Sequence, residues 1–212
     1  RIVSILFPMF AIAAVGYAAG RFTRPDLSHA NKLNMDVFVP ALIFGALASK
    51  DFRLGEYLPL LGATTVVVVG SGLAGWALAR LAGLQPKTFV PPMMFNNAGN
   101  IGLPLAVLAF GEVALAPAVV MFMVSNLAHF TFGAWLLDHR VRLTTIWRVP
   151  TVLATAAGLA VGLLGVAVWE PLMISIRMLG DISIPLMLFA LGVRMADSRI
   201  AAIGFGVFGA VA

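Results

Sequence analysis

The feature that most constrains this chain is a series of long apolar segments separated by short polar ones. A helix needs about 20 apolar residues to cross a hydrocarbon core of about 30 Å. In this 212-residue chain 61% of the residues are hydrophobic and 11% are charged, whereas soluble domains are about half apolar and about a quarter charged. We therefore expect an all-α polytopic membrane protein. The expected spans are Ile2–Gly20, Lys32–Ser49, Tyr57–Leu81, Phe89–Phe110, Val113–Leu137, Thr151–Trp169 and Ile174–Met195, with an eighth that opens at Ile200.

The basic residues indicate how these spans are oriented. They stand singly or in small groups between apolar runs, so the net charge of +5 predicts a topology signal and no nucleic-acid partner. If the N-terminus is outside the cell, the cytoplasmic loops hold ten of the fourteen basic residues. We therefore expect a multi-pass protein of the inner (plasma) membrane with its N-terminus outside. The ten residues are Arg21, Arg24, Lys32, Arg80, Lys87, Arg140, Arg142, Arg148, Arg194 and Arg199.

An internal repeat relates the two ends of the chain. The segment Asp36–Phe44 reappears as Asp181–Phe189, and every pair of equivalent residues is separated by 145 positions (181 − 36). Five expected spans separate the copies, and because five is odd the second copy must enter the membrane from the opposite side. This pattern predicts an inverted-topology repeat. We expect a first five-helix repeat at 1–138, a cytoplasmic linker at 139–149, and an incomplete second repeat at 150–212, so that about eight of ten helices are represented.

Two glycine pairs support the same repeat. Gly16 and Gly20 in the first span correspond to Gly158 and Gly162 in the sixth, at a separation of 142 positions. Glycines four residues apart let helix backbones approach closely. We expect them to serve packing within the bundle or at a homodimer contact.

The fourth expected span contains residues that disfavour a continuous helix. Three asparagines, two glycines and a proline lie between Asn96 and Pro104. Glycine permits non-helical backbone and proline removes a helix donor, and exposed backbone survives at membrane depth only where it is buried in protein or lines a wet cavity. A half-helix N-terminus attracts an anion, and neutral amides both donate and accept hydrogen bonds. We predict a helix break carried by Gly99, Gly102 and Pro104, and a substrate-binding site at Asn96, Asn97 and Asn100.

Other polar residues leave alternatives open. Asn126 and His129 share a face of the fifth span, where they could bind substrate or only bond to neighbouring helices. Histidine changes charge near neutral pH, so His129 is a candidate for proton coupling. Asp36 lies near the start of its span, where it could cap a helix or couple an ion. Arg177 is either a headgroup anchor or a substrate contact.

Signatures of enzymes and metal sites are absent from the sequence. There is no cysteine, no zinc-binding H-E-x-x-H motif and no phosphate-binding loop. We expect no catalytic residue, no metal, no cofactor and no enzymatic activity.

Three motifs carry a family resemblance: Asn96–Leu105, Val39–Phe44 and Ile184–Gly192. Together they resemble the bacterial members of the auxin efflux carrier family, which include malonate and other organic-acid permeases and belong to the bile-acid/auxin transporter superfamily. The resemblance implies ten helices in two inverted repeats, each with a crossover (broken) fourth helix, and an elevator mechanism. It also implies that Pro104 is the first crossover proline and that Asn97 contacts the substrate carboxylate.

The chain also departs from that family. Plant carriers have an acidic residue in the third span, whereas Gly62–Thr65 contains none, and the second crossover helix falls beyond these residues. We expect a permease that carries small organic anions across the lipid bilayer by alternating access. The alternatives are a sodium-coupled symporter of the bile-acid type and a non-transporting receptor or assembly subunit, and either H⁺ or Na⁺ could be the coupling ion.

Overall fold

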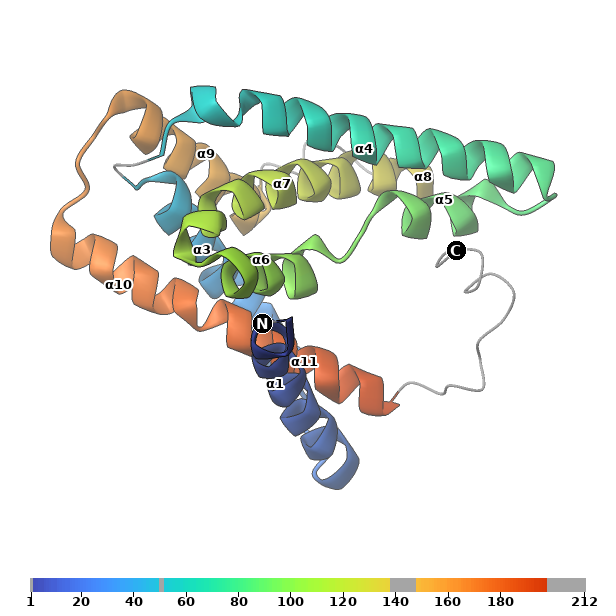
Figure 1. The fold of residues 1–212 in the computed structure, drawn as a ribbon, viewed down its shortest axis with the longest axis horizontal. Coiled ribbons are helices and arrows are strands. Elements are labelled where there is room, and N and C mark those ends of the chain that lie inside the picture. Colours follow the sequence, from blue (N-terminus) through green and yellow to red (C-terminus); the bar gives the residue numbers. More distant parts are fainter. Residues whose placement is uncertain (1, 50–51, 138–147, 198–212) are drawn as a thin grey trace.

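The computed structural model describes residues 2–49, 52–137 and 148–197, and the regular structure in these ranges is helical (Figure 1). The expected eighth span and most of the expected 139–149 linker lie outside the described residues. The α-helices are α1 (Ile2–Phe22), α2 (Ser28–Leu33), α3 (Val39–Leu47), α4 (Leu54–Leu81), α5 (Pro86–Met94), α6 (Leu103–Phe110), α7 (Leu115–Ala128), α8 (Ala134–Leu137), α9 (Pro150–Leu164), α10 (Glu170–Asp181) and α11 (Ser183–Asp197). Three short π-helical segments are η1 (Asn34–Phe38), η2 (Ala98–Gly102) and η4 (His129–Gly133), and η3 (Glu112–Ala114) is a 3₁₀ turn.

Several of these helical stretches are long and apolar enough to cross a membrane. In the described ranges four stretches qualify by length and composition, and two shorter apolar helices, Leu6–Phe22 and Pro150–Leu164, accompany them. Large apolar side chains on α4 point outward; Val66, for example, is 71% exposed. An apolar outer face is what lipid contact requires, so the protein is a multi-pass membrane protein. The four stretches are Leu54–Leu81, Pro86–Phe110, Glu112–Gly133 and Glu170–Ala196.

The observed helix ends differ from the expected spans for local reasons. The helix expected over Thr151–Trp169 ends at Leu164, because Gly165 adopts the left-handed conformation (φ 62°) that closes a helix. The span expected over Ile174–Met195 begins earlier, at Glu170, and is divided between α10 and α11. Pro185 has no N–H to donate to the carbonyl of Asp181, four residues back, and its ring crowds that carbonyl. The helix is therefore interrupted at Ile182, between α10 and α11.

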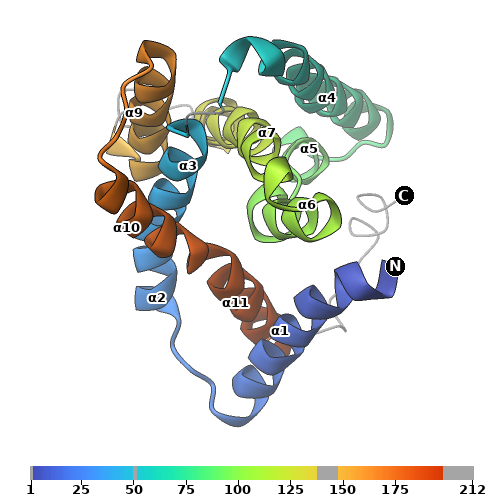
Figure 2. The ribbon, with the colours of Figure 1, turned by 60° about the vertical axis from the view of Figure 1, so that its left-hand side comes forward.

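Two helix pairs pack with their backbones in close approach. A Cβ built on Gly16 of α1 would overlap the carbonyl oxygen of Phe189 in α11. On the other pair, a Cβ on Gly158 of α9 would lie 3.3 Å from the Cα of Phe44 in α3. Figure 2 shows both pairs, with α1 against α11 and α9 beside α3. On α1 no side chain fits between the two backbones, so glycine is needed there, whereas on α9 a Cβ would be crowded by α3 and the neighbouring atoms would have to shift slightly.

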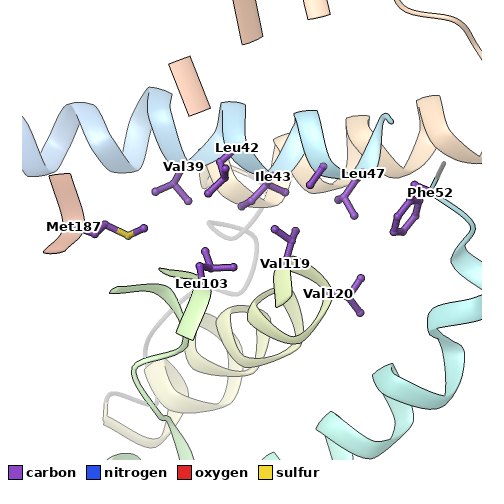
Figure 3. Close-up of a cluster of buried hydrophobic side chains, with 10 residues drawn as sticks. Val39, Leu42, Ile43, Leu47, Phe52, Leu103, Val119, Val120 and Met187 are labelled. Atoms are coloured by element: carbon purple, nitrogen blue, oxygen red, sulfur yellow. The ribbon is translucent and has the colours of Figure 1, made fainter. Parts of the chain in front are cut away.

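The hydrophobic core lies along α3. Val39, Ile43 and Leu47 are spaced four residues apart, so they share one face of the helix, and each is at most 1% exposed. Figure 3 shows this face opposite Leu103 of α6 and Val119 of α7. The core thus packs α3 against α6 and α7.

Candidate functional site

The helix that begins at Pro86 is interrupted in its middle. α5 ends at Met94, the segment Phe95–Asn97 has no helical structure, and η2 begins at Ala98. Asn97 starts the second helical part, because its Oδ1 accepts a hydrogen bond from the backbone N–H of Asn100 at 3.2 Å. A side-chain oxygen in this position satisfies a donor that a helix start leaves free.

The residues predicted to break this helix lie just after the interruption. Gly99 and Gly102 are within η2, and Pro104 is buried in the first turn of α6. A proline is tolerated in a first turn, where its missing donor has little consequence. Pro104 therefore begins α6, and it deprives the carbonyl of Asn100 of the N–H that a continuous helix would supply.

A cavity of about 530 Å³ lies beside the interruption. Its wall includes residues from η1, η2 and η4, that is, from each π-helical segment of the described ranges. π-helical insertions within α-helices occur frequently at functional sites, because they shift side chains and loosen backbone hydrogen bonding. The interrupted segment, α3, α6, α7, the first turn of α9 and Met187 of α11 also contribute to the wall.

The predicted site residues largely meet in this cavity. Asn96, Asn97, Asn100, Asn126 and His129 all line it, as does Gly99 at the start of η2. Asn100 and Asn126 are half-buried, whereas Asn96, Asn97 and His129 are exposed. Gly102 and Pro104 do not line the cavity, and they affect its shape only through the backbone conformation of η2 and α6.

Two contacts hold the site residues of α7 and η4. Asn126 donates from Nδ2 to Oγ1 of Thr151 in α9 at 3.2 Å. The ring of His129 meets the ring of Phe95 edge to face, with 4.9 Å between the centroids. Because Phe95 lies in the interrupted segment, the position of His129 is tied to the conformation of the break.

Two charged residues also line the cavity: Arg148 was expected only as a topology signal, and Asp36 was considered for helix capping or for ion coupling. Asp36 lines it from η1, and Arg148 lines it just before α9. The capping role considered for Asp36 is wrong, because Asp36 lies inside the helical stretch from Ser28 to Leu47, and neither η1 nor α3 has a side-chain cap. One sequence signal could have pointed to Arg148. Proline is typical of the first position of a helix, so Pro150 predicts a helix start, and Arg148 lies two residues before it.

The site combines neutral amides with a small number of charges. Asn96 and Asn100 have no side-chain hydrogen-bond partner within the described part of the chain, and only the oxygen of the Asn97 side chain is engaged there. Amide nitrogens and a helix start can hold a carboxylate without a buried counter-charge. The arrangement is therefore suited to reversible binding of a small anion.

Comparison with known proteins gives independent evidence of the family to which the chain is related. A family model described as "Membrane transport protein" matches residues 1–142. A protein of Rhizobium meliloti (strain 1021) described as "Putative malonate transporter" is 28% identical over 215 residues, which cover 92% of this chain and 67% of that protein. No solved structure matches the chain significantly.

Proposed function

Because the chain belongs to the membrane transport protein family, which is the auxin efflux carrier family that its motifs resemble, we propose that it is a secondary active transporter of small organic anions such as carboxylates. The family resemblance is thereby confirmed. The substrate class, the alternating-access mechanism and the site residues are our proposals.

The observation that carries this proposal is the cluster of asparagines around the interrupted helix. If these residues served only to bond helices together, their side chains would be engaged with other helices. Among Asn96, Asn97, Asn100 and Asn126, only Asn126 bonds to another helix in the described ranges. The unengaged amides face a cavity of about 530 Å³, a size that suits small-molecule ligands.

A second cavity supports alternating access. It has a volume of about 740 Å³ and is lined by residues toward the C-terminal end of α3 and the N-terminal end of α7, including Gly45 and Leu115. The first cavity uses the opposite ends of the same helices, at Val39 and Asn126. Buried core residues such as Ile43 separate the two ends. If one cavity opens toward each side of the membrane and the core between them stays closed, a substrate can reach the binding site from only one side at a time.

Reciprocal packing supports the inverted repeat. Gly16 packs on Phe189, and its counterpart Gly158 packs on Phe44, which is the counterpart of Phe189 at a distance of 145 positions. In each contact the glycine of one repeat thus packs on the phenylalanine of the other repeat, as a pseudo-two-fold axis between the repeats requires. We propose repeats at 1–138 and 150–212 joined by a linker at 139–149, with the N-terminus outside the inner membrane.

The aspartates of the repeat agree with this arrangement. Asp36 lines the first cavity, and Asp181, its counterpart, lines the second. An inverted repeat places equivalent residues on opposite sides of the membrane. The two cavities would then be related by the same axis as the two repeats.

The first substrate to test is malonate, which the relative's description names. Full-length protein in proteoliposomes should exchange labelled malonate for unlabelled malonate inside the vesicle. Binding without exchange would favour a receptor or assembly subunit and refute carrier function.

Two further conditions identify the coupling ion. Dependence on external Na⁺ would indicate a symporter of the bile-acid type. Dependence on a pH gradient that is lost in His129→Gln would support His129 as the proton-coupling group.

A further inference from the structure

One arginine of the cavity has no partner among the described residues that would explain its position. Arg148 lines the cavity together with the asparagines, and the other ionisable residues of the described lining are Asp36 and His129. In the described ranges Arg148 forms neither an ion pair nor a side-chain hydrogen bond. It is therefore the one permanently positive side chain of the described lining, and its guanidinium is available to a ligand.

The fold holds this arginine at the cavity by a specific connection. Thr151, three residues further on, is 5% exposed and accepts the hydrogen bond from Asn126 at 3.2 Å. The backbone N–H groups of Val152 and Leu153 both donate to the carbonyl of Val149, at 3.0 and 3.1 Å. The start of α9 is thereby attached to α7, so Arg148 belongs to the same wall as Asn126.

Electrostatics indicates what the arginine is for. Neutral amides are sufficient to hold one carboxylate, but a second carboxylate brings another negative charge into a cavity that already contains Asp36. Since Coulomb energy scales with the product of the charges, Asp36 repels a dianion about twice as strongly as a monoanion. A guanidinium can offset this repulsion and form paired hydrogen bonds to a carboxylate.

We propose that Arg148 determines the selectivity of the site for dianionic over monoanionic carboxylates. The asparagines beside the helix break hold one carboxylate, and Arg148 pairs with the other. This inference rests on the proposed function, because it concerns the same site, and it adds the charge class of the substrate and the residue that selects it.

The test compares two ligands of similar size and different charge, malonate and its monoamide, malonamate. Their binding to purified full-length protein is measured by isothermal titration calorimetry, and their counterflow is measured in proteoliposomes. The variants are Arg148→Gln, Arg148→Lys and the control Arg80→Gln. Arg80 lies at the end of α4, where it stacks over Trp76 at 5.2 Å and does not line the cavity.

Arg148→Gln should weaken malonate binding about ten- to a hundredfold and change malonamate binding by less than about threefold. Arg148→Lys should be intermediate, because lysine keeps the charge without the paired geometry. Arg80→Gln should leave both ligands unchanged. Retained malonamate binding by Arg148→Gln also shows that the variant is folded.

Equal losses for the two ligands, or no loss for malonate, would overturn the role of Arg148. If the wild-type protein binds malonate without counterflow, the proposed carrier function fails, while the binding series still decides the role of Arg148. If the wild-type protein binds neither ligand, both proposals are overturned.

Discussion

Asn126 on α7 donates a hydrogen bond to Thr151 on α9 at 3.2 Å, and this contact joins two helices whose connection in sequence includes η4, α8 and residues outside the described ranges. The amide nitrogen of Asn126 is thus engaged with protein, and its oxygen has no hydrogen-bond partner within the described part of the chain. Asn126 therefore positions a wall of the cavity in addition to any contact that it makes with a substrate.

Replacing Thr151 with Val should loosen this wall. The variant keeps the shape of the side chain and removes the acceptor, and a lost hydrogen bond of this kind costs about 1 kcal/mol in the free energy of unfolding. Denaturation of the purified protein in detergent by SDS measures the change. Thr151→Ser keeps the hydroxyl and should lose less of the stability. If the Thr151→Val variant is as stable as the wild type and the Thr151→Ser variant is less stable, then packing, and not the hydrogen bond, holds the two helices together.

Substitutions of Asn97 should separate its two roles, because its oxygen caps η2 and the residue also lines the cavity, where its amide nitrogen has no hydrogen-bond partner among the described residues. Asn97→Ser and Asn97→Asp keep an acceptor for the cap, whereas Asn97→Ala loses it, at a cost of about 1 kcal/mol in stability. All three remove the amide donor, so all three should weaken carboxylate binding about ten- to a hundredfold. Aspartate should be the weakest, because it adds a negative charge.

Binding of labelled malonate and thermal unfolding of the same samples check these two effects. A serine variant that is folded and binds as well as the wild type would remove the Asn97 amide from the site. Asn100, which is half-buried in the same cavity, would then be the next residue to test.

Gly16→Ala should be strongly destabilising. The added Cβ would overlap the carbonyl of Phe189, so α1 must move away from α11. Overpacking of this kind typically costs about 1–3 kcal/mol, measured as a lower temperature of unfolding or a lower yield of folded protein.

Gly70→Ala is the matched control for Gly16→Ala. Gly70 lies inside α4, and its added Cβ would have no atom within 4 Å. Alanine favours a helix over glycine by about 0.5–1 kcal/mol, so this variant should be neutral or slightly more stable. Equal behaviour of the two variants would contradict the close packing of α1 on α11.

Labelling of single cysteines should determine the orientation. These 212 residues contain no cysteine, so Arg80→Cys and Glu112→Cys each add one thiol to them, the first before and the second after the proposed fourth span. A membrane-impermeant maleimide applied to intact cells should label Glu112→Cys and leave Arg80→Cys unlabelled until the cells are lysed. The reverse pattern would place the N-terminus inside, and labelling of both from one side would remove the span between them.

The sequence alone determined the class of the protein, its family and the region of the break. Long apolar runs require lipid, because no soluble fold could bury them. The asparagines, glycines and proline between Asn96 and Pro104 act on the backbone of their own segment, so the weakness of that helix could be predicted there. The 145-residue repeat could be read from the order of the residues.

Only the tertiary structure decided which distant residues share the cavity. Arg148 and Asp36 resemble a topology signal and a helix cap when they are considered locally, and they become site residues because α3, α7 and α9 pack together. The partner of Asn126 was equally inaccessible, since it lies 25 residues away on another helix. Hydropathy and helix breaking are local properties of a chain, whereas a binding cavity depends on long-range packing that no short sequence pattern encodes.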